Sequence, residues 1–421
     1  MAAAPERILV IGAGVIGLNC AIALRKTGAA VTVVDEKGPG EGTSFGNAGC
    51  IAIAEILPIS TPGLIWDVPR MLLDPLGPLS IRWSYLPRLA PWLWRFWLAG
   101  GQARVARLTG VLASLTGRAW DDWRLVAEEA GIAHLIRQQG SLVVYDTDKG
   151  LAASAGEWAA RADYGIRFEK LAGGELRELE PALSPHYRHG YLINDWGHVA
   201  DPYRIVTGLA EHFLNQGGII LRGRIADFRR QDEKPVAALV EGAPEIAFDR
   251  VVIAAGAWSK PLCAKLGLDV PLDTERGYNT TIAKPGITVT RPITSAEGSF
   301  VATPMEMGLR IGGAVELAGL ETPANFQRSR ALLELGRRML PQLDTGGGKE
   351  WMGFRPSMPD SLPVIGVSPR DRNVLLAFGH GHLGLTEGAT TGRLIAALAT
   401  GLPTVIDIKP FRVNRRFTGV D

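Results

Sequence analysis

The sequence predicts a two-domain α/β protein, with one domain of parallel strands and helices and a second built on a mixed or antiparallel sheet plus helices. Three observations predict the first domain. The apolar run Arg7–Ile11 leads directly into a glycine-rich turn, a helical stretch and another apolar run that ends in an acid. Two later apolar runs, within 248–259 and 373–378, each lead into a turn of small residues. Continuous apolar runs of this length are typical of parallel strands buried on both faces.

Length and composition limit the class of protein before any motif is considered. A chain of 421 residues suits two domains, and 46% hydrophobic with 21% charged residues is typical of a globular protein rather than a disordered one. Lys and Arg number 45 against 43 Asp and Glu, so the net charge is only +2. This balance disfavours nucleic acid as a partner.

The cysteines and the N-terminus indicate a cytoplasmic protein. Cys20, Cys50 and Cys263 lie far apart and form no CxxC pair, which disfavours a disulfide framework and a cysteine-based metal site. His380 and His382 have no third ligand near them in sequence, so we predict no metal. The start of the chain lacks the basic region and cleavage site of a signal peptide, and no uninterrupted 18-residue apolar stretch occurs.

The first motif combines a strand, a glycine turn, a helix, a second strand and an acid. Gly12, Gly14 and Gly17 have GxGxxG spacing, which allows a tight turn, close approach of a pyrophosphate and close helix–strand packing. Residues 18–27 are predicted to be helical, and the free N–H groups at the start of this helix favour phosphate; Val15 and Ile16, within the glycine turn, are further cofactor positions. Asp35 lies 18 positions after Gly17, where a carboxylate can accept hydrogen bonds from ribose hydroxyls. Glu36 is an alternative candidate for that role. The unit predicts dinucleotide binding; the alternative is a glycine turn that binds nothing.

The segment after Asp35 argues for a cofactor larger than a nicotinamide dinucleotide. A nicotinamide enzyme would continue with alternating strands and helices. Here the glycine-rich loop GEGTSFGNAGCIA follows instead, with Ser44, Asn47 and Gly49. Such a loop suggests a chain that wraps around its ligand.

A second GxGxxG, at Gly379, Gly381 and Gly384, follows the apolar run that ends at Phe378. Only 14 residues remain after Asp407, too few to complete a second nucleotide-binding half. We therefore predict that the helix from about residue 386 points its N-terminus at the same cofactor. The strand that leads into Ala255 and Gly256 supplies a third piece, so the cofactor domain is discontinuous.

Four motifs together resemble the D-amino-acid oxidase superfamily of flavoenzymes. They are TSFGNAG, VVIAAGAWS, GFRPSMPDSLPVIG and GHGHLGLT. The resemblance covers almost the whole chain and is strongest to the bacterial D-amino-acid dehydrogenase small-subunit type and its D-hydroxyproline dehydrogenase members. It implies a glutathione-reductase-like Rossmann domain for FAD. It also implies hydride transfer from the substrate Cα to flavin N5, giving an imine that hydrolyses to a 2-oxo acid. No cysteine stands in 310–316, where related sarcosine oxidases anchor the flavin, so we expect non-covalent FAD.

The resemblance also assigns candidate site residues. Arg355 would clasp the substrate carboxylate, as a guanidinium fork suits this role. Tyr278 would close the pocket over that carboxylate, with Arg276 as a weaker second cation. His382 would pack beside the flavin or substrate and help to remove the amine proton. The remaining cofactor positions are Ser44, Asn47, Ala48, Gly49, Ile225, Ala255, Gly256, Trp258, Gly381, His382, Leu383, Gly384, Leu385 and Thr386.

We divide the chain accordingly. Residues 1–60, 196–262 and 351–421 are predicted to form the FAD domain, and residues 61–195 and 263–350 the substrate domain. Seven of the 11 tryptophans lie between Trp66 and Trp123, interleaved with arginines. We expect a helical lobe that packs them inward. The alternative is an amphipathic surface that associates peripherally with the inner face of the cell membrane.

Three functional hypotheses remain open. The first is an FAD-dependent D-amino-acid dehydrogenase that includes D-hydroxyproline-type substrates. The second is an oxidase of sarcosine, glycine or N-methyl amino acids. The third is a non-catalytic flavin-bound scaffold or assembly subunit. The expected partners are a small amino acid and an electron acceptor, which is a quinone, oxygen or a partner subunit.

Overall fold

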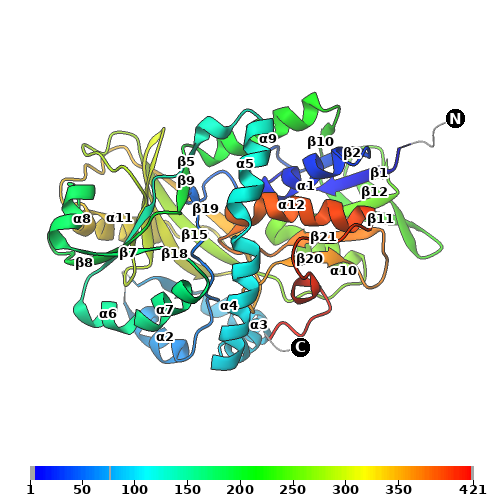
Figure 1. The fold of residues 1–421 in the computed structure, drawn as a ribbon. Helices are drawn as coiled ribbons and strands as arrows, with labels where there is room; N and C mark the ends of the chain where they lie inside the picture. The colour runs from blue at the N-terminus through cyan, green and yellow to red at the C-terminus, as the bar shows by residue number, and fades with distance from the viewer. Residues whose placement is uncertain (1–4, 75–76, 419–421) are drawn as a thin grey trace.

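The computed structural model describes residues 5–74 and 77–418 (Figure 1). Its first sheet has the order β10-β2-β1-β14-β21-β20, and every neighbouring pair is parallel except the last. The strands are β10 (Ile219–Arg222), β2 (Ala30–Asp35), β1 (Arg7–Ile11), β14 (Arg250–Ile253), β21 (Val374–Phe378) and β20 (Val364–Val367).

Helices cover one face of this sheet and a small sheet covers the other. Ile8 and Val10 of β1 face a core shared with the helices, whereas Leu9 and Ile11 face the opposite core, as the two-residue period of a strand requires. The helices on the first face are α1 (Val15–Arg25), α5 (Ala119–Glu129), α9 (Pro202–Asn215) and α12 (Gly384–Thr400). The opposite face carries β11 (Ile225–Gln231), β12 (Lys234–Val240), β13 (Ile246–Ala247) and α10 (Ser259–Lys265).

A nine-stranded mixed sheet forms the other half of the molecule, on the left in Figure 1. Its path is β19-β15-β18-β17-β16-β6-β8-β7, with β4 beside β18. The pairs are antiparallel except β16 with β6 and β18 with β4. The strands are β19 (Lys349–Ser357), β15 (Asp273–Ile282), β18 (Gly308–Leu317), β17 (Phe300–Met305), β16 (Ile293–Ser295), β6 (Ser141–Tyr145), β8 (His189–Ile193), β7 (Glu169–Ala172) and β4 (Leu79–Ile81).

Helix α11 (Gln327–Met339) packs on β18 and β15, and α8 (Gly173–Leu179) on β7 and β8. A third sheet joins β3 (Cys50–Ile51), β9 (Gly197–Val199) and β5 (Ile136–Arg137). The division into two domains remains our prediction, but one of its boundaries divides a strand. Residue 351 lies inside β19, which pairs with β15 along its length, so β19 belongs to the nine-stranded sheet.

The tryptophan-rich region forms α2 (Leu64–Leu73), α3 (Leu86–Ala99) and α4 (Gln102–Thr116), near α6 (Asp148–Ala153) and α7 (Ala155–Asp163) in Figure 1. The expectation of inward packing holds for Trp92 and Trp123, which are buried. It is wrong for four others, because Trp66, Trp83, Trp94 and Trp97 are 84%, 70%, 60% and 49% exposed. None of the helices described is both long enough and apolar enough to cross a membrane.

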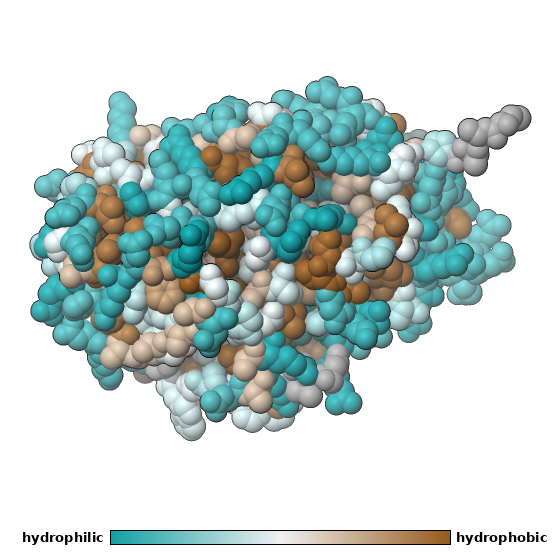
Figure 2. Space-filling model, viewed as in Figure 1, coloured by the Kyte–Doolittle hydropathy of each residue, from teal (hydrophilic) through white to brown (hydrophobic). Residues whose placement is uncertain are grey.

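The surface view separates the parts of the molecule by polarity. Figure 2 shows hydrophilic residues at both ends of the molecule and hydrophobic residues in patches across the middle of this face. This pattern is normal for a globular surface, much of which is apolar.

Gly392 sets the close approach of α1 and α12. A Cβ at this position would lie 2.5 Å from the main-chain oxygen of Asn19, and a backbone atom cannot rotate away. We expect Gly392→Ala to lower the free energy of unfolding by about 1–3 kcal/mol, in spite of alanine's higher helix propensity. Urea denaturation of the FAD-loaded protein measures the change.

Gly174→Ala is the matched control, because Gly174 lies in helix α8, is exposed and would have no neighbouring heavy atom within 4 Å of an added Cβ. It should leave stability unchanged or raise it by up to about 1 kcal/mol. Equal urea midpoints for the two variants would contradict the proposed contact between the helices.

Candidate active site

One large cavity, of about 990 Å³, is bordered by parts of the chain that are far apart in sequence. They are the turn after β1, the loop at 42–52, the ends of β2 and β14, strands β11, β15, β18 and β19, and the turn between β21 and α12. Its volume lies at the upper end of the range for ligand pockets. The cavity therefore has room for a dinucleotide together with a small substrate.

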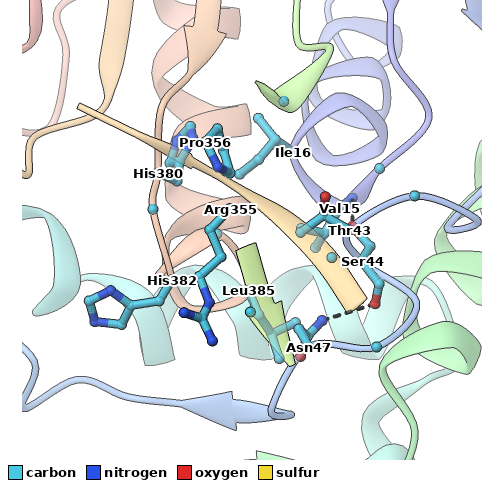
Figure 3. A pocket seen from close by; sticks show the side chains of 18 of the residues that line it. Val15, Ile16, Thr43, Ser44, Asn47, Arg355, Pro356, His380, His382 and Leu385 are labelled. Atoms are coloured by element: carbon cyan, nitrogen blue, oxygen red, sulfur yellow. Dashed lines mark hydrogen bonds between the residues drawn. The ribbon is translucent and has the colours of Figure 1, made fainter. Parts of the chain in front are cut away.

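The glycine turn after β1 forms one wall of the cavity. Gly12 has φ +111°, a conformation that favours glycine, and a Cβ there would lie 2.4 Å from the oxygen of Ala254. Gly14 borders the cavity, and the neighbouring Val15 N–H donates to Ser44 Oγ at 3.1 Å (Figure 3). The loop at 42–52 is thereby fixed against the start of α1.

Two acids stand at the end of β2, and both border the cavity. Asp35 accepts hydrogen bonds from the main-chain N–H groups of Ala13, Lys37 and Gly38, at 2.8, 2.9 and 3.2 Å. Its carboxylate thus holds the glycine turn in shape while retaining lone pairs for a ligand. The side-chain carboxylate of Glu36 has no hydrogen bond to another described residue, so both acids could meet ribose hydroxyls.

The loop residues are connected by an internal network. Asn47 Nδ2 donates to the Ser44 carbonyl at 3.0 Å, and the Gly49 N–H donates to Asn47 Oδ1 at 2.7 Å (Figure 3). Arg310 Nη1 donates to the Asn47 carbonyl at 2.6 Å. Burial lowers the pKa of Arg310 to about 10. These bonds fix the loop beside the cavity in one conformation.

Most of the predicted cofactor positions border the cavity. They are Gly12, Gly14, Val15, Ile16, Asp35, Glu36, Ser44, Asn47, Ala48, Gly49, Ile225, Ala255, Gly256, Trp258, Gly381, His382, Gly384 and Leu385.

Three predicted positions do not border it, each for a local reason. Gly17 packs against Gly12, whose oxygen would lie 1.8 Å from a Cβ at position 17. Leu383 is 5% exposed within the core. Thr386 uses its Oγ1 to accept the N–H of Ala52 at 2.9 Å. All three support the wall from behind.

Arg355 presents a fixed guanidinium on the cavity wall. Its Nη1 and Nη2 donate to the carbonyls of Ala314 and Gly313, at 3.0 and 3.4 Å, which leaves further N–H groups of the five free for a ligand. Gly277 leaves room for it, because a Cβ there would lie 2.3 Å from Arg355 Nη2. Burial lowers the pKa of Arg355, and the charge of Glu275 opposes this effect.

The predicted role of Tyr278 is not supported by the geometry. Its hydroxyl donates to Glu316 and accepts the N–H of Asn325 at 2.9 Å, so it is engaged within the protein. Successive residues of β15 point to opposite faces, and Glu275, Gly277 and Asn279 occupy the face toward Arg355 and the loop. Tyr278 itself borders the cavity, but its hydroxyl is turned toward Glu316 and Asn325.

Arg276 also has a structural role. It is fully buried, and its Nε donates to the carbonyl of Gly319 at 2.7 Å. It lies 3.5 Å from Glu316, which neutralises its charge.

The two histidines of GHGH have different surroundings. His380 is buried against Thr391 Oγ1 at 3.0 Å, and burial lowers its pKa to about 3. His382 borders the cavity, and Figure 3 shows its imidazole at the same end as the Arg355 guanidinium. The imidazole of His382 is exposed to the cavity, and desolvation by the protein around it is the main cause that lowers its pKa; Glu55 and Glu275 raise the pKa, and Arg355 lowers it. Both histidines border the cavity, but His380 is buried and engaged with Thr391, whereas His382 is exposed to the cavity.

Sequence reasoning missed several cavity residues. Glu55, Glu275 and Asn279 lie on the wall near this end, and none belongs to a recognisable motif. The two-residue period of β15 could have identified Glu275 and Asn279 once Gly277 was placed. At the other end lie Arg224, Glu241 and Lys265.

The residues present fit FAD. The glycine turn and the start of α1 form a cradle for a pyrophosphate. Asn279 lines the cavity, and its buried Oδ1 has no partner among the described residues although its Nδ2 donates to Gly46. An unpaired buried acceptor on a cavity wall indicates that a ligand supplies the missing donor.

Comparison with known proteins agrees with this fit. The family described as FAD dependent oxidoreductase matches residues 7–398. A D-amino-acid oxidase of Bradyrhizobium diazoefficiens is 38% identical, with 97% of this chain and 99% of the relative covered. A D-amino acid dehydrogenase of Granulibacter bethesdensis is 30% identical, with the same coverage.

Solved structures share the fold at lower sequence identity. Glycine oxidase from Geobacillus kaustophilus superposes with a TM-score of 0.72 at 21% identity, covering 98% of this chain and 99% of the other. L-proline dehydrogenase from P. horikoshii gives 0.73 at 18% identity, with 98% of each chain covered. From the family match, the full-length relatives and the fitting cradle, it follows that this chain belongs to the FAD-dependent oxidoreductase family and uses FAD as its cofactor.

Proposed function

We propose that the protein oxidises D-amino acids, converting the amine carbon to an imine that water then hydrolyses to a 2-oxo acid. The observation that carries the proposal is Arg355, a fixed guanidinium with free N–H groups in the FAD cavity. A guanidinium recognises a carboxylate through two parallel hydrogen bonds. The names of the two relatives at 38% and 30% identity support an amino-acid substrate of the D series.

The division of labour among the residues follows from their positions. FAD, when bound, supplies the hydride acceptor. Arg355 holds the substrate carboxylate and so orients the Cα–H bond. The protein around His382 lowers its pKa, which favours the neutral imidazole, and its exposure to the cavity lets that imidazole take the proton of the substrate ammonium. The N-terminus of α12 borders the same cavity through Gly384 and favours negative charge there.

Three further possibilities share most of these residues. Sarcosine, glycine and N-methyl amino acids also carry a carboxylate for Arg355, and D-hydroxyproline-type substrates would give a cyclic imine. A non-catalytic scaffold would bind FAD without turning over. An anaerobic screen of D-, L- and N-alkyl amino acids separates these possibilities by loss of flavin absorbance, and subsequent addition of oxygen or quinone identifies the electron acceptor.

Arg355→Ala tests the carboxylate site. We expect KM for a D-amino acid to rise about 10- to 100-fold or more, because a charge-assisted pair is lost, while the flavin absorbance of the purified protein is unchanged. Arg355→Lys should reverse only part of the rise in KM seen in Arg355→Ala, since an ammonium group cannot form two parallel hydrogen bonds with a carboxylate. Loss of FAD, or an unchanged KM, would refute the assignment.

His382→Asn tests the proton acceptor through the pH profile. Because burial lowers the pKa of His382, the wild-type kcat/KM should stay level on lowering the pH through 6.5 and fall only below it, as the imidazole becomes protonated. The variant should lose this acid limb and about 100-fold or more of the rate of flavin reduction. An identical acid limb in both proteins would assign it to another group.

We further propose that α2 and α3 dock on an anionic membrane, which would bring the protein to a lipid-soluble electron acceptor. The exposed tryptophans lie in a segment, residues 61–107, that has six arginines and two aspartates, whereas the whole chain is nearly balanced. Exposed Trp with Arg is the composition of interfacial segments.

Trp94 and Trp97 make the membrane hypothesis testable, because both are exposed on α3 and their ring centroids lie 4.9 Å apart. We expect the wild type to sediment with phosphatidylglycerol vesicles at low salt and the double variant Trp94→Ala/Trp97→Ala to remain in solution. Leu214→Ala, at a 47% exposed leucine of α9, is the control and should bind as the wild type does. Absence of wild-type binding would argue against membrane docking.

A further inference from the structure

One carboxylate on the cavity wall has no partner among the residues described. Glu55 follows β3 and borders the cavity, together with Ile59 from the same segment. Across the part of the chain that the structure describes, no side chain or main-chain group hydrogen-bonds or ion-pairs with this carboxylate. Glu55 is half-buried, and a carboxylate without a protein partner on a cavity wall keeps all its lone pairs for a ligand.

Glu55 stands at the substrate end of the cavity. Ala52, three residues before Glu55, donates its N–H to Thr386 Oγ1 near the start of α12, which brings this segment beside the turn that carries His382. The charge of Glu55 also acts on the His382 imidazole, as do the charges of Arg355 and Glu275. The charged residues at the other end of the cavity, Arg224, Glu241 and Lys265, are not among the groups that act on His382. Glu55 therefore faces the substrate rather than the nucleotide part of FAD.

Arg355 forms no ion pair with Glu55, and the carboxylate of Glu275 already balances its charge. Glu275 and Arg355 are directly opposed in the β15–β19 register, and the charge of Glu275 raises the pKa of Arg355. Glu275 also accepts a hydrogen bond from Ser357 Oγ at 2.6 Å. When a substrate carboxylate binds Arg355, this end of the cavity holds three carboxylates and one guanidinium. The substrate ammonium offsets one of the two excess negative charges, and one remains.

The excess charge does not suit the reacting amine itself. A carboxylate beside an ammonium group favours its protonated form. Oxidation needs the free amine, whose lone pair assists departure of the hydride from Cα. A carboxylate paired with the ammonium would therefore oppose the reaction, whereas one paired with a remote cation would not.

We propose that Glu55 forms a subsite for a positively charged side chain, so that the enzyme prefers D-amino acids with a cationic side chain, such as D-arginine, over neutral and acidic ones. This inference rests on the function proposed above. Ile59 adds an apolar surface that suits the methylene stem of such a side chain. D-Hydroxyproline has no side-chain cation and ranks lower.

The experiment compares D-arginine with D-citrulline, which has nearly the same shape without the charge. Rates of anaerobic flavin reduction give kcat/KM for the holoenzyme. We expect the wild-type kcat/KM to be about 10- to 100-fold higher for D-arginine than for D-citrulline, the ratio expected from one charge-assisted hydrogen bond. Glu55→Gln should bring this ratio close to one by lowering only the D-arginine value. Glu321→Gln, at an exposed acid that does not border the cavity, should keep the wild-type ratio.

The outcomes separate the subsite from the proposed function. A wild type that reduces its flavin with both substrates equally would overturn the subsite while D-amino-acid oxidation stands. A Glu55→Gln variant that slows both substrates equally would place Glu55 on the amine or on His382 instead, and so also overturn it. No flavin reduction by any D-amino acid would overturn both.

Discussion

Parallel strands that lie side by side end at the same edge of their sheet, and the active site of this protein depends on that constraint. β1, β14 and β21 are neighbours although they lie hundreds of residues apart in sequence. Each leads into a turn of small residues, at Gly12–Gly14, Ala255–Gly256 and Gly381–Gly384, and all three turns border one cavity. Small residues are required there because the backbones approach each other and the ligand closely. The rest of the chain is arranged around that edge.

The charges on the wall of the cavity are the second principle of the site. Arg355 is held by two main-chain carbonyls and balanced by Glu275, so it is preorganised before a substrate arrives. Burial makes each unbalanced charge more expensive there than it would be in water. The protein around His382 also lowers its pKa. The unpaired carboxylate of Glu55 would attract a cationic ligand more strongly on this cavity wall than it would at the protein surface. Under the proposed function, selectivity would follow from which substrate completes the charge balance.

The sequence was most informative where a local motif enforces a local geometry. The turns around Gly12 and Gly381 could be predicted because strand, glycine spacing and helix form one continuous pattern. Tyr278 was assigned to the wrong face of β15, because the phase of a two-residue period depends on a partner strand that the local sequence does not specify. Thr386 was predicted to contact the cofactor, but it does not border the cavity. Its Oγ1 accepts the N–H of Ala52, a hydrogen bond that only the fold reveals. Glu55 was missed because nothing local distinguishes it from a surface acid.

The strand order of the first sheet also constrains how the protein is made. β1 and β2 are synthesised long before β21, which pairs with β14 and comes from residues 374–378. The cofactor edge therefore cannot be complete, and cannot enclose FAD, before β21 has been synthesised. Until then, β14 lacks its neighbour β21, and its unpaired edge is open to aggregation with other chains. The supply of flavin during the final stage of folding thus becomes a determinant of how much protein reaches the active form.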